Sequence, residues 1–97
     1  MSKGYWVTTY RKIKDPSKLA AYGQLAGPAV AAAGGKFLVR GVADEVREQG
    51  LKERTVVIEF PSYEDAVAAY DRDDYKKALA ALGDAVERDL RIVRGAE

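Results

Sequence analysis

The chain has 97 residues, of which 16 are basic and 15 are acidic, so its formal net charge is +1. This length allows one domain, residues 1–97, and the balanced charge gives no basic surplus for nucleic acid, whose non-specific affinity comes from neutralised phosphates. The sequence contains no His and no Cys. This composition excludes a Ser-His-Asp triad, a Cys nucleophile, a histidine zinc site and a histidine-ligated haem.

The first residues run directly into a strand pattern, so we expect no signal peptide. No apolar run approaches the roughly 20 residues that span a bilayer. The lack of Cys fits a reducing compartment. We therefore expect a cytoplasmic protein that has no nucleic-acid or membrane partner and that uses neither a metal nor a cofactor.

The first part of the chain predicts a strand followed by a helix. Residues 5–11 are rich in aromatic and β-branched side chains, which favours a strand. The Asp-Pro pair at residues 15–16 predicts a helix start, with an N-cap followed by a proline at the first helical position. An apolar stripe then continues to the glycines at 34–35, which end the helix. Pro28 lies inside this stretch and predicts a kink or a division into two helices.

The rest of the chain predicts two paired strands, an interrupted helix and a last strand. Residues 36–42 and 54–60 are mainly apolar runs, and the polar stretch between them predicts a twisted arm. Residues 62–65 resemble a capping box that opens a second helix. The polar residues 71–74 interrupt that helix, and residues 89–94 predict the fourth strand.

The element order is β-α-β-β-α-β, which is the ferredoxin-like arrangement of an α+β fold. Two helices can cover only one face of the four-stranded antiparallel sheet. Adjacent strand residues point to opposite faces, yet both are apolar at Leu38 and Val39 and again at Val57 and Ile58. The uncovered face must pack against something, and a second copy of the same sheet is the simplest candidate. We therefore expect a homodimer packed through this face.

Several blocks of the sequence together resemble one known family. They are Gly4-Tyr5-Trp6, Gly34-Gly35-Lys36-Phe37-Leu38-Val39-Arg40-Gly41, Val56-Val57-Ile58-Glu59-Phe60-Pro61-Ser62, and the later Tyr70 and Tyr75. Across nearly the whole chain, these blocks resemble the domain of unknown function 1330 family. The resemblance implies the dimeric α/β-barrel superfamily, in which two ferredoxin-like protomers join their sheets into a barrel. That superfamily includes cofactor-free monooxygenases, isomerases, haem-dependent members and ligand-sensing domains, so the resemblance implies no single reaction.

Glu59 is a carboxylate inside an otherwise apolar strand. Burying a charge without a partner is costly, so Glu59 needs a counter-ion or a chemical role. Arg40 ends the preceding apolar run, just before a bulge or bend predicted at Gly41. We expect Arg40 and Glu59 to pair on neighbouring strands, on the face away from the helices. The pair is either structural or catalytic, with Glu59 as a base beside a carbonyl group and Arg40 stabilising the oxyanion.

Aromatic residues supply the candidate ligand-binding groups. Trp6 forms either part of the core or a flat wall for a planar ligand. Tyr22, Tyr70 and Tyr75 lie on helices, where their hydroxyls either line a pocket or complete the packing. We expect a small-molecule pocket between sheet and helices, used for binding a small organic ligand or for modest cofactor-free acid/base chemistry. The alternative is a non-catalytic ligand-sensing or accessory module, in which the pair of Arg40 and Glu59 is structural.

Overall fold

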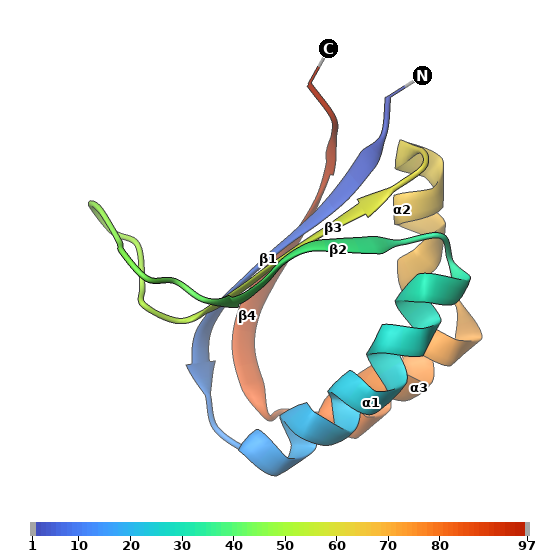
Figure 1. The fold of residues 1–97 in the computed structure, drawn as a ribbon. Helices are drawn as coiled ribbons and strands as arrows, with labels where there is room; N and C mark the ends of the chain where they lie inside the picture. The colour runs from blue at the N-terminus through green and yellow to red at the C-terminus, as the bar shows by residue number, and fades with distance from the viewer. Residues whose placement is uncertain (1, 97) are drawn as a thin grey trace.

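A computed structural model describes residues 2–96 as a layer of helices on a four-stranded sheet (Figure 1). The elements in chain order are β1 (Gly4–Ile13), α1 (Pro16–Ala32), β2 (Lys36–Val42), β3 (Arg54–Phe60), α2 (Tyr63–Tyr70), α3 (Asp73–Leu82) and β4 (Val86–Arg94). This order is the predicted ferredoxin-like one. The second helical region is divided into α2 and α3, close to the interruption predicted at residues 71–74. No helix within residues 2–96 is long and apolar enough to cross a membrane.

The helix starts follow the local sequence. The Asp15 carboxylate accepts hydrogen bonds from the backbone N–H groups of Ser17 and Lys18, each at 3.1 Å, and so caps α1. The Ser62 hydroxyl caps α2 by accepting from Asp65 N–H at 3.0 Å. Both predicted N-caps are therefore confirmed.

Helix α1 continues through Pro28, so it is not divided into two helices. A proline removes one backbone hydrogen bond, but the turns beside it are held against the core by Ala26, Ala29 and Val30, which are all buried. At the other end of the chain, β4 begins at Val86, earlier than the predicted start at Asp89.

The sheet order is β2-β3-β1-β4, and every neighbouring pair is antiparallel. The three helices lie on one side of the sheet, which we call the inner face (Figure 1). The core between the two layers contains Trp6, Phe60 and Tyr75 as its largest fully buried side chains. Within residues 2–96, no helix lies on the opposite, outer face.

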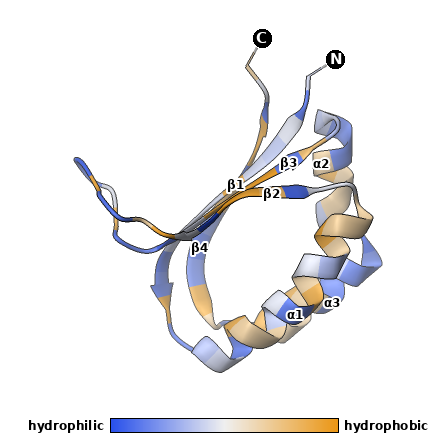
Figure 2. Cartoon of the chain, in the orientation of Figure 1, coloured by the Kyte–Doolittle hydropathy of each residue, from blue (hydrophilic) through white to orange (hydrophobic). Residues whose placement is uncertain are grey.

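The outer face has an apolar centre. Val39, Val57 and Val7 are aligned across β2, β3 and β1 in the strand register. Val39 is 48% exposed and Val93 on β4 is 45% exposed. Figure 2 shows hydrophobic colour along the middle of β2 and β3. Beyond these strands, residues 43–53 form an arm that extends away from the sheet (Figure 1).

Gly4 begins β1 where the chain leading into α2 passes over it. A Cβ at this position would lie 2.6 Å from Tyr63 Cα and 2.7 Å from the Ser62 carbonyl oxygen. Because backbone atoms cannot move aside as a flexible side chain does, we expect Gly4→Ala to reduce the free energy of unfolding by about 1–3 kcal/mol. Urea denaturation measures this loss. Gly41→Ala is the control, since a Cβ there meets nothing within 4 Å, and equal losses for the two variants would contradict the close approach.

Candidate functional site

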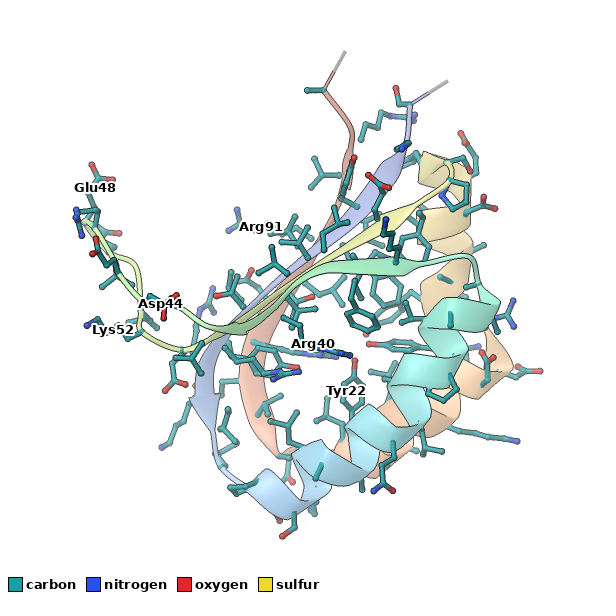
Figure 3. All side chains as sticks on the ribbon, viewed as in Figure 1. Tyr22, Arg40, Asp44, Glu48, Lys52 and Arg91 are labelled. Carbon is teal, nitrogen blue, oxygen red and sulfur yellow. The ribbon has the colours of Figure 1, made fainter. Side chains whose placement is uncertain are left out.

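A cavity of about 60 Å³ lies between the inner face of the sheet and α1, with room for a few water-sized groups. Its polar lining consists of Thr8, Tyr10, Tyr22, Arg40, Arg54 and Arg88. Figure 3 shows Arg40 and Tyr22 pointing into the same space from β2 and α1. A groove of about 310 Å³ near the start of α1 shares four lining residues with the cavity, namely Tyr10, Tyr22, Gly23 and Arg54. The cavity and the groove are therefore neighbours with these residues between them.

Arg88 on β4 organises a cluster of three tyrosines, which we call the Arg88 network. Its Nη1 donates to the hydroxyl oxygens of Tyr10 at 3.0 Å and Tyr22 at 3.3 Å, and its Nη2 donates to that of Tyr75 at 3.2 Å. The Tyr22 and Tyr75 hydroxyls also share a hydrogen bond of 2.6 Å. The network thus ties β1, β4, α1 and α3 together beside the cavity.

The electrostatics of the network keep Tyr75 in the neutral form. Burial raises the pKa of Tyr75, and the neighbouring Tyr22 hydroxyl raises it further. Burial alone would lower the pKa of Arg88, but the surrounding tyrosine hydroxyls raise that pKa overall. Arg88 is therefore a fixed cation, and Tyr75 is a hydrogen-bond donor rather than a base at neutral pH.

Two further arginines reach the cavity. The Arg54 Nε–H group is buried and has no hydrogen-bond partner among residues 2–96. The Arg54 guanidinium carbon lies 6.0 Å from the centroid of the Tyr10 ring. Arg40 is exposed, and its guanidinium lies 4.4 Å from the centroid of the Phe37 ring, a cation–π contact. Among the carboxylates of residues 2–96, none lies within 4.0 Å of a side-chain nitrogen of Arg40, Arg54 or Arg88.

Two glycines of α1 leave the helix wall of the cavity open. Gly23 and Gly27 both line the cavity, and a Cβ at either position would meet nothing within 4 Å. Glycine inside a helix costs about 1 kcal/mol relative to alanine. At Gly27 the following Pro28 gives a local reason, because a proline restricts the residue before it. No proline follows Gly23, so the residue after it does not explain a glycine at this position. Because Gly23 has no side chain, the cavity beside α1 stays open there.

The expected pair of Arg40 and Glu59 does not form. In the register between β2 and β3, Arg40 is opposite Val56, a buried inner-face residue, whereas Glu59 is opposite Lys36. Because Val56 and Glu59 are three residues apart on β3, they point to opposite faces. Arg40 therefore lies on the inner face and Glu59 on the outer face.

A β-bulge is the physical reason for this difference. The register shifts between Phe37 and Val39, so that Leu38 is the extra residue on β2. Strict alternation from the inward-facing Phe37 would have placed Arg40 on the outer face with Glu59, although opposite Thr55 and four residues away along β3. The extra residue moves Arg40 to the other face. The sequence places a bulge or bend at Gly41, which is too late to have this effect.

Glu59 has other partners on the outer face. Its carboxylate accepts a hydrogen bond of 2.8 Å from the Tyr5 hydroxyl and lies 3.4 Å from Lys3 Nζ. The hydrogen bond from Tyr5 lowers the pKa of Glu59, and the charge of Lys3 lowers it further. This carboxylate is consequently ionised at neutral pH and far from the cavity.

A double-mutant cycle tests the separation of Arg40 from Glu59. With the two side chains on opposite faces of the sheet, we expect the variants Arg40→Ala and Glu59→Ala to show a coupling energy below about 0.5 kcal/mol. Urea denaturation of the two single variants and the double variant measures it. The cycle of Tyr5→Phe with Glu59→Gln is the matched positive control. A coupling energy above about 1.5 kcal/mol between Arg40 and Glu59 would show that the two side chains form an ion pair, and would contradict their separation.

The structure brings together some of the predicted aromatic residues. Tyr22 and Tyr75 meet in the Arg88 network, and Trp6 lines the cavity. Tyr70 lies away from this cavity and packs its ring against Trp6, with centroids 5.9 Å apart, and against Tyr75, at 5.3 Å. It also lines a shallow depression with Arg88. Tyr70 is therefore a packing residue at the edge of the site.

Sequence reasoning missed Arg54 and Arg88. Arg54 has the same parity on β3 as the buried Val56 and Ile58, and Arg88 has the same parity on β4 as Leu90. Period-two alternation therefore predicts that both arginines face the helices. The signal at Arg88 was hidden because the predicted strand began one residue after it.

Fold and site together define a ferredoxin-like α+β domain with an arginine- and tyrosine-lined cavity between its sheet and helices. Residues 3–96 match the model of the family described as domain of unknown function (DUF1330), so the chain belongs to this family. The resemblance inferred from its sequence blocks is confirmed. A comparison with curated proteins finds no match.

Solved structures share the fold at low sequence identity. A protein of unknown function from Rhodopseudomonas palustris has a TM-score of 0.73 at 19% identity, covering 99% of this chain and 84% of the other. SnoaB, a cofactor-independent oxygenase from Streptomyces nogalater, has a TM-score of 0.67 at 12% identity, with coverages of 100% and 96%. A dimeric ferredoxin-like protein of unknown function from Thermobifida fusca has a TM-score of 0.57 at 14% identity, with coverages of 96% and 91%. These similarities confirm the α+β fold class.

Proposed function

We propose that the protein binds a small organic molecule in the cavity between its sheet and α1. The observation that carries the proposal is the Arg88 network, a partly buried polar cluster beside a cavity that α1 leaves unfilled. Holding a half-buried arginine without a carboxylate partner costs desolvation energy, so the arrangement calls for a compensating role. Apolar walls with a few convergent polar groups are the usual composition of a ligand site.

Binding accounts for the site better than the acid/base chemistry expected from the sequence. That chemistry used Glu59 as the base, and Glu59 lies on the outer face. Tyr75 and the arginines beside the cavity are donors at neutral pH. A ligand-sensing or accessory module is therefore the function that the geometry supports best. The fold itself is compatible with catalysis, since SnoaB is a cofactor-independent oxygenase, but a shared fold does not transfer a reaction.

We also propose that the protein functions as a homodimer joined through the outer face. In a single chain Val39 is exposed and its row neighbours Val7 and Val57 are half-buried, and a second copy of the same face would cover all three. The description of the similar protein from Thermobifida fusca as dimeric supports self-association. The cavity lies on the other side of the sheet, so one protomer supplies the cavity lining described above.

A thermal-shift screen over small carboxylates and phenols tests the binding proposal. A ligand at 100 times its Kd stabilises the folded state by about 2.7 kcal/mol, which raises the Tm of a domain of this size by roughly 10–20 °C. We expect at least one compound to raise the Tm of the wild-type protein in this way.

Gly23→Leu is the matched control for this screen. Leucine is a better helix former than glycine, and the side chain would extend from α1 into the open space. The variant should fold at least as stably as the wild type and lose the response to the ligand. Equal shifts in both proteins, or no shift in either, would count against binding in the cavity.

A further inference from the structure

We propose that the ligand of this cavity is an organic carboxylate, with its carboxylate group between Arg54 and the Arg88 network and its apolar part in the adjoining groove. This inference rests on the proposed binding function and specifies its chemical class. It follows from the hydrogen-bond donors, the charges and the shape of the site.

The site has more donors than acceptors. The hydroxyl oxygens of Tyr10, Tyr22 and Tyr75 all accept hydrogen bonds from Arg88. The bond between Tyr22 and Tyr75 uses one hydroxyl proton, and the other two of the three protons have no acceptor among residues 2–96. The buried Nε–H of Arg54 has none either. Leaving buried donors unpaired is unfavourable, so the site fits a ligand that brings acceptor atoms.

The site also has a surplus of positive charge. Arg40, Arg54 and Arg88 all line the cavity, and no carboxylate of the described chain pairs with any of them. Guanidinium groups bind planar carboxylates through short, charge-assisted hydrogen bonds. An ionised carboxylate is an acceptor with no donor of its own. It therefore meets both requirements of the site at once.

The shape indicates an organic anion with an apolar body. The cavity of about 60 Å³ holds only a small group. The groove that shares four lining residues with it is lined in part by Pro16, Leu19 and Ala20. A ligand with a carboxylate at one end and an apolar body at the other would fill both, with the anion against the arginines and the body along α1.

Benzoate and benzamide form a matched pair of probes that differ in charge and have nearly the same shape. Isothermal titration calorimetry of the intact protein measures both affinities, and the Nε–Hε resonance of Arg54 in a ¹H–¹⁵N spectrum reports contact. We expect benzoate to bind at least about tenfold more tightly than benzamide, because the carboxylate gains charge-assisted hydrogen bonds. We also expect benzoate to shift the Arg54 resonance.

Variants connect the affinity to the named donors. Arg54→Met should weaken benzoate binding at least about tenfold, and Arg54→Lys should also weaken it because lysine keeps the charge but lacks the Nε–H group. Tyr10→Phe removes one donor and should cause a smaller loss. Arg72→Met is the control, because Arg72 pairs with Asp74 outside the cavity. Circular dichroism confirms that each variant is folded.

The outcomes separate the inference from the function on which it rests. Benzamide binding as tightly as benzoate, with loss of both in Gly23→Leu, would overturn the carboxylate inference and leave the binding function standing. Inorganic phosphate binding as tightly as benzoate would overturn the choice of an organic carboxylate. If no compound of the screen binds in the cavity, both proposals fail.

Discussion

Trp6→Ala is expected to reduce the free energy of unfolding by about 3–5 kcal/mol, the range for removing a large aromatic side chain from a core. Trp6 is only 1% exposed, and its ring centroid lies 5.1 Å from that of Phe60 and 5.0 Å from that of Tyr75. Its indole N–H donates to the Ala66 carbonyl oxygen at 2.7 Å, which links β1 to α2. A domain of this size has about 5–15 kcal/mol of stability in total, so the loss is a large fraction of it.

Urea denaturation followed by circular dichroism measures the effect of Trp6→Ala. Trp6→Phe is the matched control, because it keeps an aromatic ring and loses the hydrogen bond to the Ala66 carbonyl. We expect this variant to lose less than half as much stability as Trp6→Ala. A loss below about 1.5 kcal/mol for Trp6→Ala would contradict the central packing role.

Val57→Lys is expected to dissociate the proposed homodimer. Val57 lies in the centre of the outer face, between Val7 on β1 and Val39 on β2. In a symmetric dimer the substitution places two unpaired ammonium groups in one interface. Their desolvation should weaken the dimer at least about 100-fold, equivalent to about 2.8 kcal/mol.

Sedimentation equilibrium at micromolar concentration measures this change. Leu25→Lys is the control, because Leu25 is 45% exposed on α1, away from the outer face. That variant should remain dimeric. A wild-type protein that is monomeric at micromolar concentration would refute the assembly, and a dimeric Val57→Lys would place the interface elsewhere.

The sequence predicted the fold well because the fold depends on local signals. The caps at Asp15 and Ser62 mark helix starts through side chains next to the backbone groups that they satisfy. Period-two alternation in β3 identifies Val56, Ile58 and Phe60 as the core face, and all three are buried. Such patterns require no knowledge of distant contacts.

The site was harder to predict because a single extra residue in β2 moves Arg40 to the opposite face of the sheet. The bulge at Leu38 moves Arg40 from the outer to the inner face, and no residue in β2 identifies its position beforehand. The Arg88 network joins residues up to 78 positions apart in the chain, as between Tyr10 and Arg88. Its members could be assigned to the inner face from alternation, but their meeting depends on the packing of α1 and α3 against the sheet.

The site also shows where the chain gives up stability. Gly23 weakens α1 without relieving any close contact, and the Arg54 Nε–H group is buried without a partner. Local choices that oppose folding are concentrated at functional sites in many proteins. Gly23 and Arg54 both line the same cavity. This is the pattern expected of a binding site whose unpaired groups are satisfied when a ligand binds.

The most direct test of the account is a crystal structure of the protein grown with benzoate. We expect benzoate in the cavity, with its carboxylate within hydrogen-bond distance of Arg54 and of the tyrosine hydroxyls of the Arg88 network, and its ring in the groove beside Leu19. Benzoate bound only on the outer face, or a cavity filled by the protein's own side chains, would contradict it.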